Sequence, residues 1–280
     1  MAHKIKTIKD FYNFALLNDK SREHEIKVKI LLMYCNNIDT FSRLTLHFND
    51  EMKNKRFFKS ALKKINGGYP VQYIVKGVNF FGYDFFINEN TLIPRPETEE
   101  LVDIVIEYLK TVSDKDLIIA DICTGSGVIG LTLAKTFPNY KVICTDLSKK
   151  ALKVAKINNK KLETKALILQ GNHLMPLIEN NIKVDVIVAN PPYILNEDFV
   201  EENVKNFEPH IALYDQGFTV FKNIVKYAYK VIKENGRLYF EVSEHHAEEM
   251  LNFVKNEINP AKVRLITDLQ GKKRFMEVII

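Results

Sequence analysis

The chain has 280 residues, a length that allows one large domain or one large and one small domain. Its hydrophobic content of 46% and charged content of 27% are typical of a globular protein and exclude a fibrous or disordered chain. The net charge of +5 permits weak attraction to an anionic partner but does not indicate one.

The sequence offers no sign of a membrane or secreted protein. No segment approaches the ~20 apolar residues of a membrane span, and the N-terminus lacks the apolar core of a secretory signal. The cysteines Cys35, Cys123 and Cys144 form neither a Cys-x-x-Cys pair nor a disulfide framework. We therefore expect a reducing, cytoplasmic setting.

Residues 1–68 predict a small helical bundle. Four segments carry apolar residues at helical spacing, and the last of them ends at Gly67-Gly68. Residues 69–96 predict a β-hairpin linker, because two aromatic-rich runs flank Gly82-Tyr83. Pro94-Arg95-Pro96 then makes a rigid entry into a helix.

Residues 97–280 predict an α/β domain. Short apolar runs alternate with helical patterns, which implies a doubly wound, mostly parallel sheet. A helix is expected over residues 218–233, and the last two strands are expected to pair with each other. The expected strands are 117–122, 141–145, 166–170, 184–189, 237–242, 263–267 and 274–280.

A glycine-rich turn follows the first of these strands. Gly125-x-Gly127-x-x-Gly130 fits the dinucleotide fingerprint, and Asp146 follows about 20 residues later. Such a turn suits any adenosine-bearing cofactor, with the acid on the ribose. Asp121 favours S-adenosylmethionine over a nicotinamide, because its carboxylate is placed to pair with a cationic amino group. An ordinary tight turn remains the plain alternative.

Asn190-Pro191-Pro192-Tyr193 follows the strand at 184–189, where open α/β sheets bind their ligands. Two prolines make a stiff corner, which leaves the Asn190 side-chain oxygen and the Pro191 carbonyl as acceptors. Tyr193 adds an aromatic face, so the segment predicts a clamp for a planar –NH2 group. Methyl transfer to such a nitrogen needs mainly positioning. The alternative is a rigid turn without chemistry.

Other polar residues carry weaker signals. His173 is placed to cover an adenine ring or else is a surface histidine. His245-His246 point to different faces of a helix, so no metal site is expected. The lysine-rich stretch 149–161 predicts a solvated helix face rather than a nucleic-acid site.

Several motifs together resemble the bacterial release factor glutamine methyltransferases, also called protein-(glutamine-N5) methyltransferases. The resemblance covers almost the whole chain, and the first motif is the most specific. The motifs are Leu92-Ile93-Pro94-Arg95-Pro96-Glu97-Thr98-Glu99, Asp121-x-Cys123-Thr124-Gly125-Ser126-Gly127, Asn190-Pro191-Pro192-Tyr193-Ile194 and Phe207-Glu208-Pro209.

The resemblance implies a class I methyltransferase with a Rossmann-like, seven-stranded sheet and S-adenosylmethionine in the glycine-rich loop. It implies methylation of the side-chain amide of the glutamine in the Gly-Gly-Gln motif of release factors, modulating translation termination. Asn190, Pro191 and Tyr193 would be catalytic, and Pro192 would join them in binding substrate. The cofactor, leaving as S-adenosylhomocysteine, would contact Asp121, Cys123, Thr124, Gly125, Ser126, Gly127, Asp146, Asn172, His173 and Asn190.

The chain departs from the family pattern at three places. The family usually has Gly at Cys123, so the thiol must point away from the cofactor or move it slightly. At Asn172-His173 the family commonly has Asp and an aromatic, so the adenine would be held more weakly. After the fifth strand the family often has a glutamate, any one residue and then a glycine, whereas here Glu241 is followed by Val242 and Ser243.

Two other functions remain open at this point. One is a methyltransferase for an amino group of nucleic acid, adenine N6 or guanine N2, which would need a broad basic groove and base flipping. The other is a non-catalytic docking protein on the same fold. We expect release factors as partners, no stable nucleic-acid complex, no membrane contact and a monomer.

Overall fold

The structure, a computed structural model, describes residues 6–113, 116–195 and 200–280. The chain divides into two compact units, Met1–Lys76 and Gly77–Ile280. Among the described residues, no helix is both long and apolar enough to cross a membrane.

The N-terminal unit is a bundle of helices, and side chains cap the N-termini of the first three. The Thr7 hydroxyl accepts from the Asp10 amide while Asp10 accepts in return, a capping box. The core is mostly aliphatic, with one aromatic pair: the rings of Phe11 and Phe58 meet edge to face, with centroids 5.4 Å apart. The helices are α1 (Ile8–Ala15), α2 (Arg22–Asn36), α3 (Phe41–Leu46), α4 (Lys55–Asn66) and α5 (Val71–Val75).

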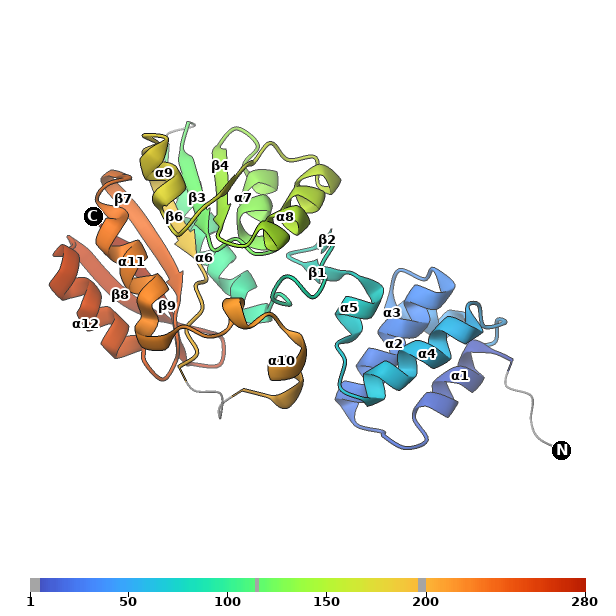
Figure 1. The fold of residues 1–280 in the computed structure, drawn as a ribbon. Helices are drawn as coiled ribbons and strands as arrows, with labels where there is room; N and C mark the ends of the chain where they lie inside the picture. The colour runs from blue at the N-terminus through green and yellow to red at the C-terminus, as the bar shows by residue number, and fades with distance from the viewer. Residues whose placement is uncertain (1–5, 114–115, 196–199) are drawn as a thin grey trace. The chain divides into compact units, whose positions relative to one another are not determined.

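The C-terminal unit begins with the predicted hairpin and continues as alternating strands and helices (Figure 1). The hairpin strands β1 (Val78–Phe80) and β2 (Tyr83–Phe85) are antiparallel. The other strands are β3 (Ile118–Ile122), β4 (Lys141–Asp146), β5 (Leu167–Gln170), β6 (Val184–Ala189), β7 (Ile232–Glu241), β8 (Lys262–Thr267) and β9 (Lys273–Ile279). The helices are α6 (Pro96–Thr111), α7 (Val128–Thr136), α8 (Lys149–Lys161), α9 (Met175–Glu179), α10 (Glu202–Phe207), α11 (Thr219–Ala228) and α12 (Ala247–Ile258), with short 3-10 turns η2 (His210–Ala212) and η3 (Gln216–Phe218).

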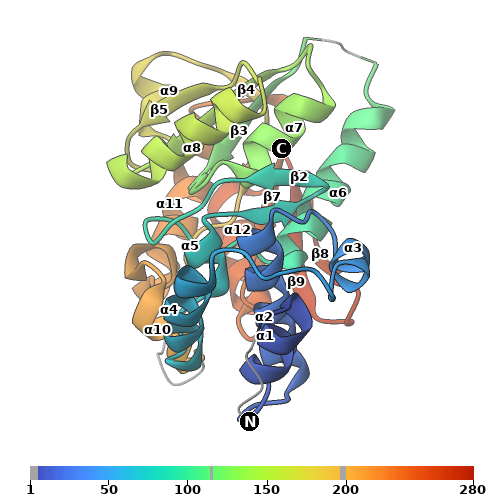
Figure 2. The same cartoon turned by 90° about the vertical axis from the view of Figure 1, so that its right-hand side faces the viewer.

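The seven-stranded sheet has the order β5-β4-β3-β6-β7-β9-β8. Figure 2 shows β4 and β5 towards one side of the sheet and β8 and β9 towards the other. The first five strands in this order are parallel, and β9 is antiparallel to both neighbours. This confirms the mostly parallel sheet and the pairing of the last two strands. The chain order reverses between β3 and β6, which is where such sheets bind ligands.

Helices cover both faces of the sheet because the strand side chains alternate between two cores. One core joins Ala120 and Ile122 of β3 to α11 and α12 through Phe221 and Met250. The other joins Ile119 of β3 to α6 and α7. Buried strand residues on both faces explain why the strands read as continuous apolar runs.

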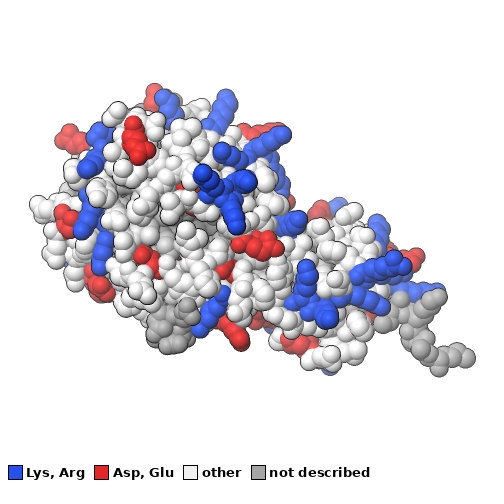
Figure 3. Space-filling model, in the orientation of Figure 1, with Lys and Arg blue, Asp and Glu red and all other residues white. Residues whose placement is uncertain are grey.

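The exposed face of α8 carries lysines. Figure 3 shows blue side chains grouped over this part of the C-terminal unit. The exposed lysines of this helix are Lys149, Lys150, Lys153, Lys156, Lys160 and Lys161.

The boundary between α11 and β7 differs from the sequence prediction. The helix ends at Ala228 rather than near residue 233, and β7 starts at Ile232. Buried Val231 and Ile232 pair with β6, where the Val184 amide donates to the Val231 carbonyl at 2.8 Å. A register shift before Arg237 absorbs the extra residues. The apolar residues of this short run fit a helical period, so the sequence pattern did not distinguish the start of the strand from the end of the helix.

Two motifs that lie far apart in sequence are joined by an ion pair between a partly exposed arginine and a buried glutamate. Arg95 Nη2 lies 2.6 Å from Glu208 Oε1, and the Ile93 amide donates to Glu208 Oε2 at 3.0 Å. The Glu208 side chain is 2% exposed and that of Arg95 is 34% exposed. The pair holds the loop before α6 against the segment after α10.

The turn after β3 contains a strained residue. Cys123 has a φ of +62°, in the left-handed region that disfavours any residue with a Cβ. The Thr124 amide donates to the Thr145 carbonyl at 2.9 Å, which ties the turn to the end of β4. The backbone therefore explains why glycine suits this position better than cysteine.

We expect Arg95→Ala to be more destabilising than Glu208→Ala. Arg95→Ala leaves a buried carboxylate without its counter-charge. Glu208→Ala leaves the neutral Ile93 amide without its acceptor and frees a partly exposed guanidinium to turn into water, and a buried unpaired charge costs more than an unpaired amide. The expected loss for Arg95→Ala is about 3 kcal/mol in unfolding free energy, at the low end for such pairs because Arg95 is partly exposed. Urea unfolding of both variants measures the difference. Equal losses would contradict the account of the pair.

The strain at Cys123 predicts a difference between two substitutions. Cys123→Gly and Cys123→Ala both remove the thiol, but only glycine adopts this φ freely. We expect the glycine variant to be more stable than the alanine variant by about 1 kcal/mol. Thermal unfolding of the two proteins measures this gap. A more stable alanine variant would show that strain does not matter here.

Candidate active site

An open cavity of about 960 Å³ lies at the carboxyl ends of β3, β4 and β6. The glycine-rich turn, the end of β4 and the start of the Asn-Pro-Pro-Tyr segment all contribute to it. The predicted site residues that line it are Cys123, Thr124, Gly125, Ser126, Asp146, Asn172, His173, Asn190 and Pro192. The structure thus brings together most residues that the sequence analysis singled out.

The glycine-rich turn is held by Asp146. Its Oδ2 accepts from the Gly125 amide at 2.8 Å, and its Oδ1 accepts from the Ser148 amide at 2.8 Å. Burial raises the pKa of Asp146 above its usual value. Gly125 has a φ of +57°, and a Cβ there would point into open space. The turn therefore presents backbone and an acid to the cavity, which suits a ribose and a polar chain.

Asp121 lies behind the turn and is fully buried, outside the residues that line the cavity. Its Oδ2 accepts from the Thr124 hydroxyl at 2.5 Å and from the Gly130 amide at 2.8 Å. Burial raises the pKa of Asp121 to about 7. Its Oδ1 has no hydrogen-bond partner within the described part of the chain. An orphaned buried acceptor of this kind leaves a place for a donor.

Two of the three departures from the family pattern lie at the cavity, whereas Val242 and Ser243 are buried and do not line it. Cys123, Asn172 and His173 line the cavity, and Cys123 also packs against one of the two cores of the sheet. Burial lowers the pKa of His173, which favours the neutral ring. Gly127 lies outside the cavity lining, at the start of α7.

Asn190 follows β6 and has a fixed amide orientation. Its Nδ2 donates to Glu241 Oε2 at 2.8 Å and to the Thr98 hydroxyl at 3.2 Å. These bonds leave the Asn190 Oδ1 as an acceptor for another group. Pro192 also lines the cavity, whereas Pro191 and Tyr193 do not.

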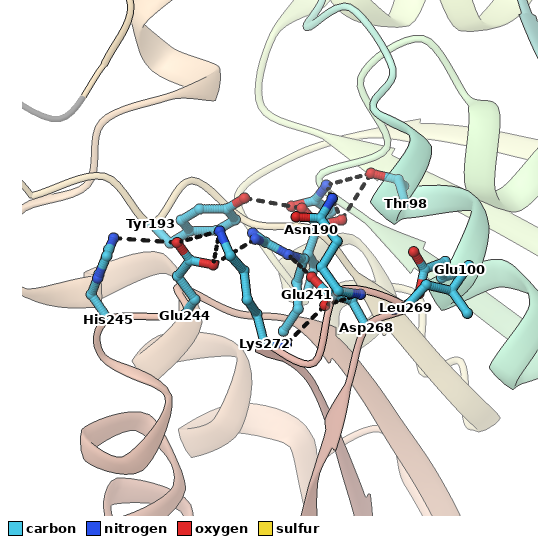
Figure 4. A network of polar contacts seen from close by, with 12 residues as sticks. Thr98, Glu100, Asn190, Tyr193, Glu241, Glu244, His245, Asp268, Leu269 and Lys272 are labelled. Carbon is cyan, nitrogen blue, oxygen red and sulfur yellow. Dashed lines mark hydrogen bonds and ion pairs between the residues drawn. The ribbon is translucent and has the colours of Figure 1, made fainter.

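Tyr193 is anchored through its hydroxyl, which donates to Glu241 Oε1 at 3.0 Å. Figure 4 shows Tyr193, Asn190 and Thr98 around the Glu241 carboxylate. Burial raises the pKa of Tyr193 well above its usual value, so the ring stays neutral and donates.

The sequence analysis gave no role to Thr98 or Glu241. Glu241 ends β7 and is 2% exposed, although it carries a charge. An acid at the end of an otherwise apolar strand was the available signal, because a buried charge needs partners. Thr98 belongs to the Leu92–Glu99 motif, but a threonine in the first turn of a helix is common, so nothing distinguished it within that motif.

A second polar group adjoins this network. Arg274 donates to Asp268 Oδ2 at 2.9 Å through Nε and to Glu244 Oε2 at 2.8 Å through Nη2. Its charge also acts on Glu241 and lowers the pKa of that carboxyl, against the stronger effect of burial. In the described ranges, no group of three or more His, Cys, Asp or Glu side chains could hold a metal ion.

Comparison with known proteins identifies relatives over most of the chain. Residues 100–263 match the family described as the Methyltransferase small domain. The release factor glutamine methyltransferase of Staphylococcus aureus is 35% identical over 243 residues, which cover 85% of this chain and 86% of that protein. The enzyme of the same name from Bacillus subtilis is 33% identical and aligned over 99% of both chains.

Solved structures share the fold. A Thermus thermophilus 16S rRNA N2 G1207 methyltransferase, in complex with AdoMet and guanosine, matches with a TM-score of 0.53 and 13% identity. The match covers 72% of this chain and 49% of that chain. A SAM-dependent methyltransferase from Agrobacterium tumefaciens matches with a TM-score of 0.51 and 16% identity, over 72% and 69%. These likenesses concern the fold, which is that of a class I S-adenosylmethionine-dependent methyltransferase.

The profile match spans more than half of the chain, and the relatives share a third of its residues along most of its length. The chain therefore belongs to the family of release factor glutamine methyltransferases.

Proposed function

We propose that this protein transfers the methyl group of S-adenosylmethionine to the side-chain amide nitrogen of the glutamine in the Gly-Gly-Gln motif of release factors. The observation that carries the proposal is the fixed amide of Asn190 at the wall of the cavity. Its nitrogen is committed to Glu241 and Thr98, so only its oxygen is free to accept from a substrate –NH2 group.

The residues of the cavity fit the cofactor. Gly125 leaves open space where a side chain would stand, and Asp121 keeps an orphaned acceptor behind the turn. In our proposal Thr124 to Gly127 hold the methionine part and Asp146 binds the ribose. Asn172 accepts from the adenine amino group and His173 covers its ring, and Cys123 and Asn190 complete the contact. The cofactor supplies an electrophilic methyl group bound to a sulfonium.

The clamp acts on the substrate amide by orientation. Asn190 Oδ1 and the Pro191 carbonyl accept its two N–H bonds, while Pro192 keeps the corner stiff and Tyr193 offers a flat ring. Both bonds increase electron density on a nitrogen that is otherwise a poor nucleophile. They also strengthen as positive charge develops on that nitrogen, so they favour the transition state over the ground state. After transfer the methylated nitrogen loses its extra proton to water.

The proposal includes the setting in which the protein works. Cys35, Cys123 and Cys144 are free thiols, in keeping with a reducing cytoplasm. Release factors are the protein partner, and the protein acts on them as a monomer without a stable nucleic-acid complex.

Intact-protein mass spectrometry tests the proposed reaction directly. We expect a release factor incubated with this protein and S-adenosylmethionine to gain one methyl group. A release factor whose Gly-Gly-Gln glutamine is replaced by alanine should gain none. Methylation of both factors would place the modified residue elsewhere. No methylation of either, with cofactor bound, would redirect the search to nucleic-acid amino groups.

We expect Asn190→Ala to abolish most turnover while it changes cofactor affinity much less. Loss of one oriented acceptor should lower kcat by on the order of 100-fold or more. Asn180→Ala is the matched control. Asn180 directly follows α9, donates to the Pro176 carbonyl of that helix and does not line the cavity. Single-turnover methylation and calorimetric cofactor binding give the two quantities. Turnover near that of the parent protein would remove Asn190 from the mechanism.

A further inference from the structure

Glu241 is the centre of the polar network behind the clamp. Its carboxylate accepts from the Thr98 hydroxyl at 2.8 Å, from Asn190 Nδ2 at 2.8 Å and from the Tyr193 hydroxyl at 3.0 Å. The donors come from α6 and from the segment after β6, and all three point towards the acid at the end of β7 (Figure 4). Glu241 itself is not among the residues that line the cavity.

We propose that Glu241 is a positioning residue for methyl transfer, which sets the amide orientation of Asn190 and the ring orientation of Tyr193. This inference rests on the proposed function, because it assigns Glu241 a role through two residues of the clamp. Glu241 reaches both of them and, from its buried place, does not touch the substrate.

The carboxylate selects one of two orientations of the Asn190 amide. An ionised carboxylate accepts hydrogen bonds and cannot donate them. The observed orientation gives Glu241 the Asn190 –NH2 group, and the reverse would set two oxygen atoms against each other. Because Thr98 and Tyr193 also donate to the same carboxylate, only the observed arrangement satisfies every group. Asn190 therefore presents its oxygen, and never its nitrogen, to the substrate.

The same contact strengthens the acceptor. An amide that donates an N–H bond to a charged acceptor carries more negative charge on its oxygen, because linked hydrogen bonds polarise one another. Asn190 Oδ1 is thus a better acceptor than an asparagine held by a neutral group. The gain is largest when the substrate nitrogen becomes positive, so we expect it in kcat rather than in KM.

Burial and charge around Glu241 connect this role to pH. Burial raises the pKa of Glu241, and Glu97 of α6 adds to the rise, while Thr98, Tyr193 and Arg274 of β9 lower it. The carboxylate form is needed to accept three bonds. As the pH falls through this raised pKa, protonation supplies an O–H that competes with the three donors. The fall of kcat on the acid side of its pH profile should therefore follow the protonation of Glu241.

Glu277 provides a matched control on the neighbouring strand β9. It is buried, and it also accepts from a tyrosine hydroxyl, that of Tyr239 at 2.9 Å. Its other partners are Arg237 and Arg264, and it does not line the cavity. A loss that arises merely from disturbing a buried carboxylate in this sheet would appear in Glu277→Gln as well.

The experiment compares Glu241→Gln, Glu241→Asp and Glu277→Gln with the parent protein on a release factor. For Glu241→Gln we expect kcat to fall on the order of 100-fold, because glutamine brings an –NH2 group among three donors. Cofactor affinity by calorimetry and KM for the release factor should each change by less than about threefold. Glu241→Asp should keep the charge at a shorter reach and recover about a tenth of the parent kcat.

The dependence of kcat on pH distinguishes a positioning role from a purely structural one, which would leave it unchanged. The kcat of the parent protein should decline on the acid side, at a pH above the usual range of a glutamic acid. In Glu241→Gln the part of that decline that comes from Glu241 should be lost, whereas the part that comes from Asp121 and Asp146, whose pKa values burial also raises, should remain. Glu277→Gln should keep the parent profile and kcat, whatever it costs in thermal stability.

Four results would overturn the inference. Two concern kcat: a parent-like kcat in Glu241→Gln, or an equal loss of kcat in Glu277→Gln. The other two are an acid side of the pH profile that is unchanged in Glu241→Gln, and a loss of kcat in proportion to the loss of cofactor binding. If Glu241→Gln fails to fold, Glu241→Asp decides, and a parent-like kcat there overturns the inference. Absence of methylation by the parent protein would instead refute the proposed function, so the two failures are distinct.

Discussion

The site depends on the parallel pairing of β3 with β6. Their register sets Ile122 beside Ala189, so the two strands end level and their following residues leave the sheet side by side. The next residue on β3 opens the glycine-rich turn, and the next on β6 is Asn190. One set of backbone hydrogen bonds thus fixes both halves of the site. A one-residue slip would turn every side chain of β6 to the other face and move the clamp away from the turn.

That pairing alone would place Asn190 without fixing its amide, and buried charge supplies the remaining constraint. A carboxylate with 2% exposure is tolerated only where donors surround it. The donors around Glu241 are two clamp residues and Thr98. The same hydrogen bonds therefore stabilise the buried carboxylate and orient the clamp. The arrangement illustrates how a buried polar network can specify geometry as well as cost free energy.

Sequence reasoning predicted what local pattern determines. The buried strands, the hairpin and the cavity residues Gly125, Asp146 and Asn190 follow from apolar runs and from where they end. It missed Glu241 and Thr98 because their partners lie 51 and 92 residues from them in the chain, at Asn190. It also extended α11 into β7, since a short apolar run fits both periods until its partner strand is known. Long-range contacts decide these points, and no window of sequence contains them.

The motif at the start of α6 shows how such long-range contacts can still produce a recognisable local sequence pattern. Three of its polar residues reach different segments: Arg95 bonds Glu208, Thr98 bonds Glu241, and Glu99 accepts from the Phe81 amide of the hairpin at 2.7 Å. Prolines on both sides of Arg95 restrict the backbone, so these three side chains leave it in fixed directions. The motif is therefore a junction that joins the hairpin, the clamp and the segment after α10. A junction of this kind restricts several adjacent positions at once, because each faces its own partner.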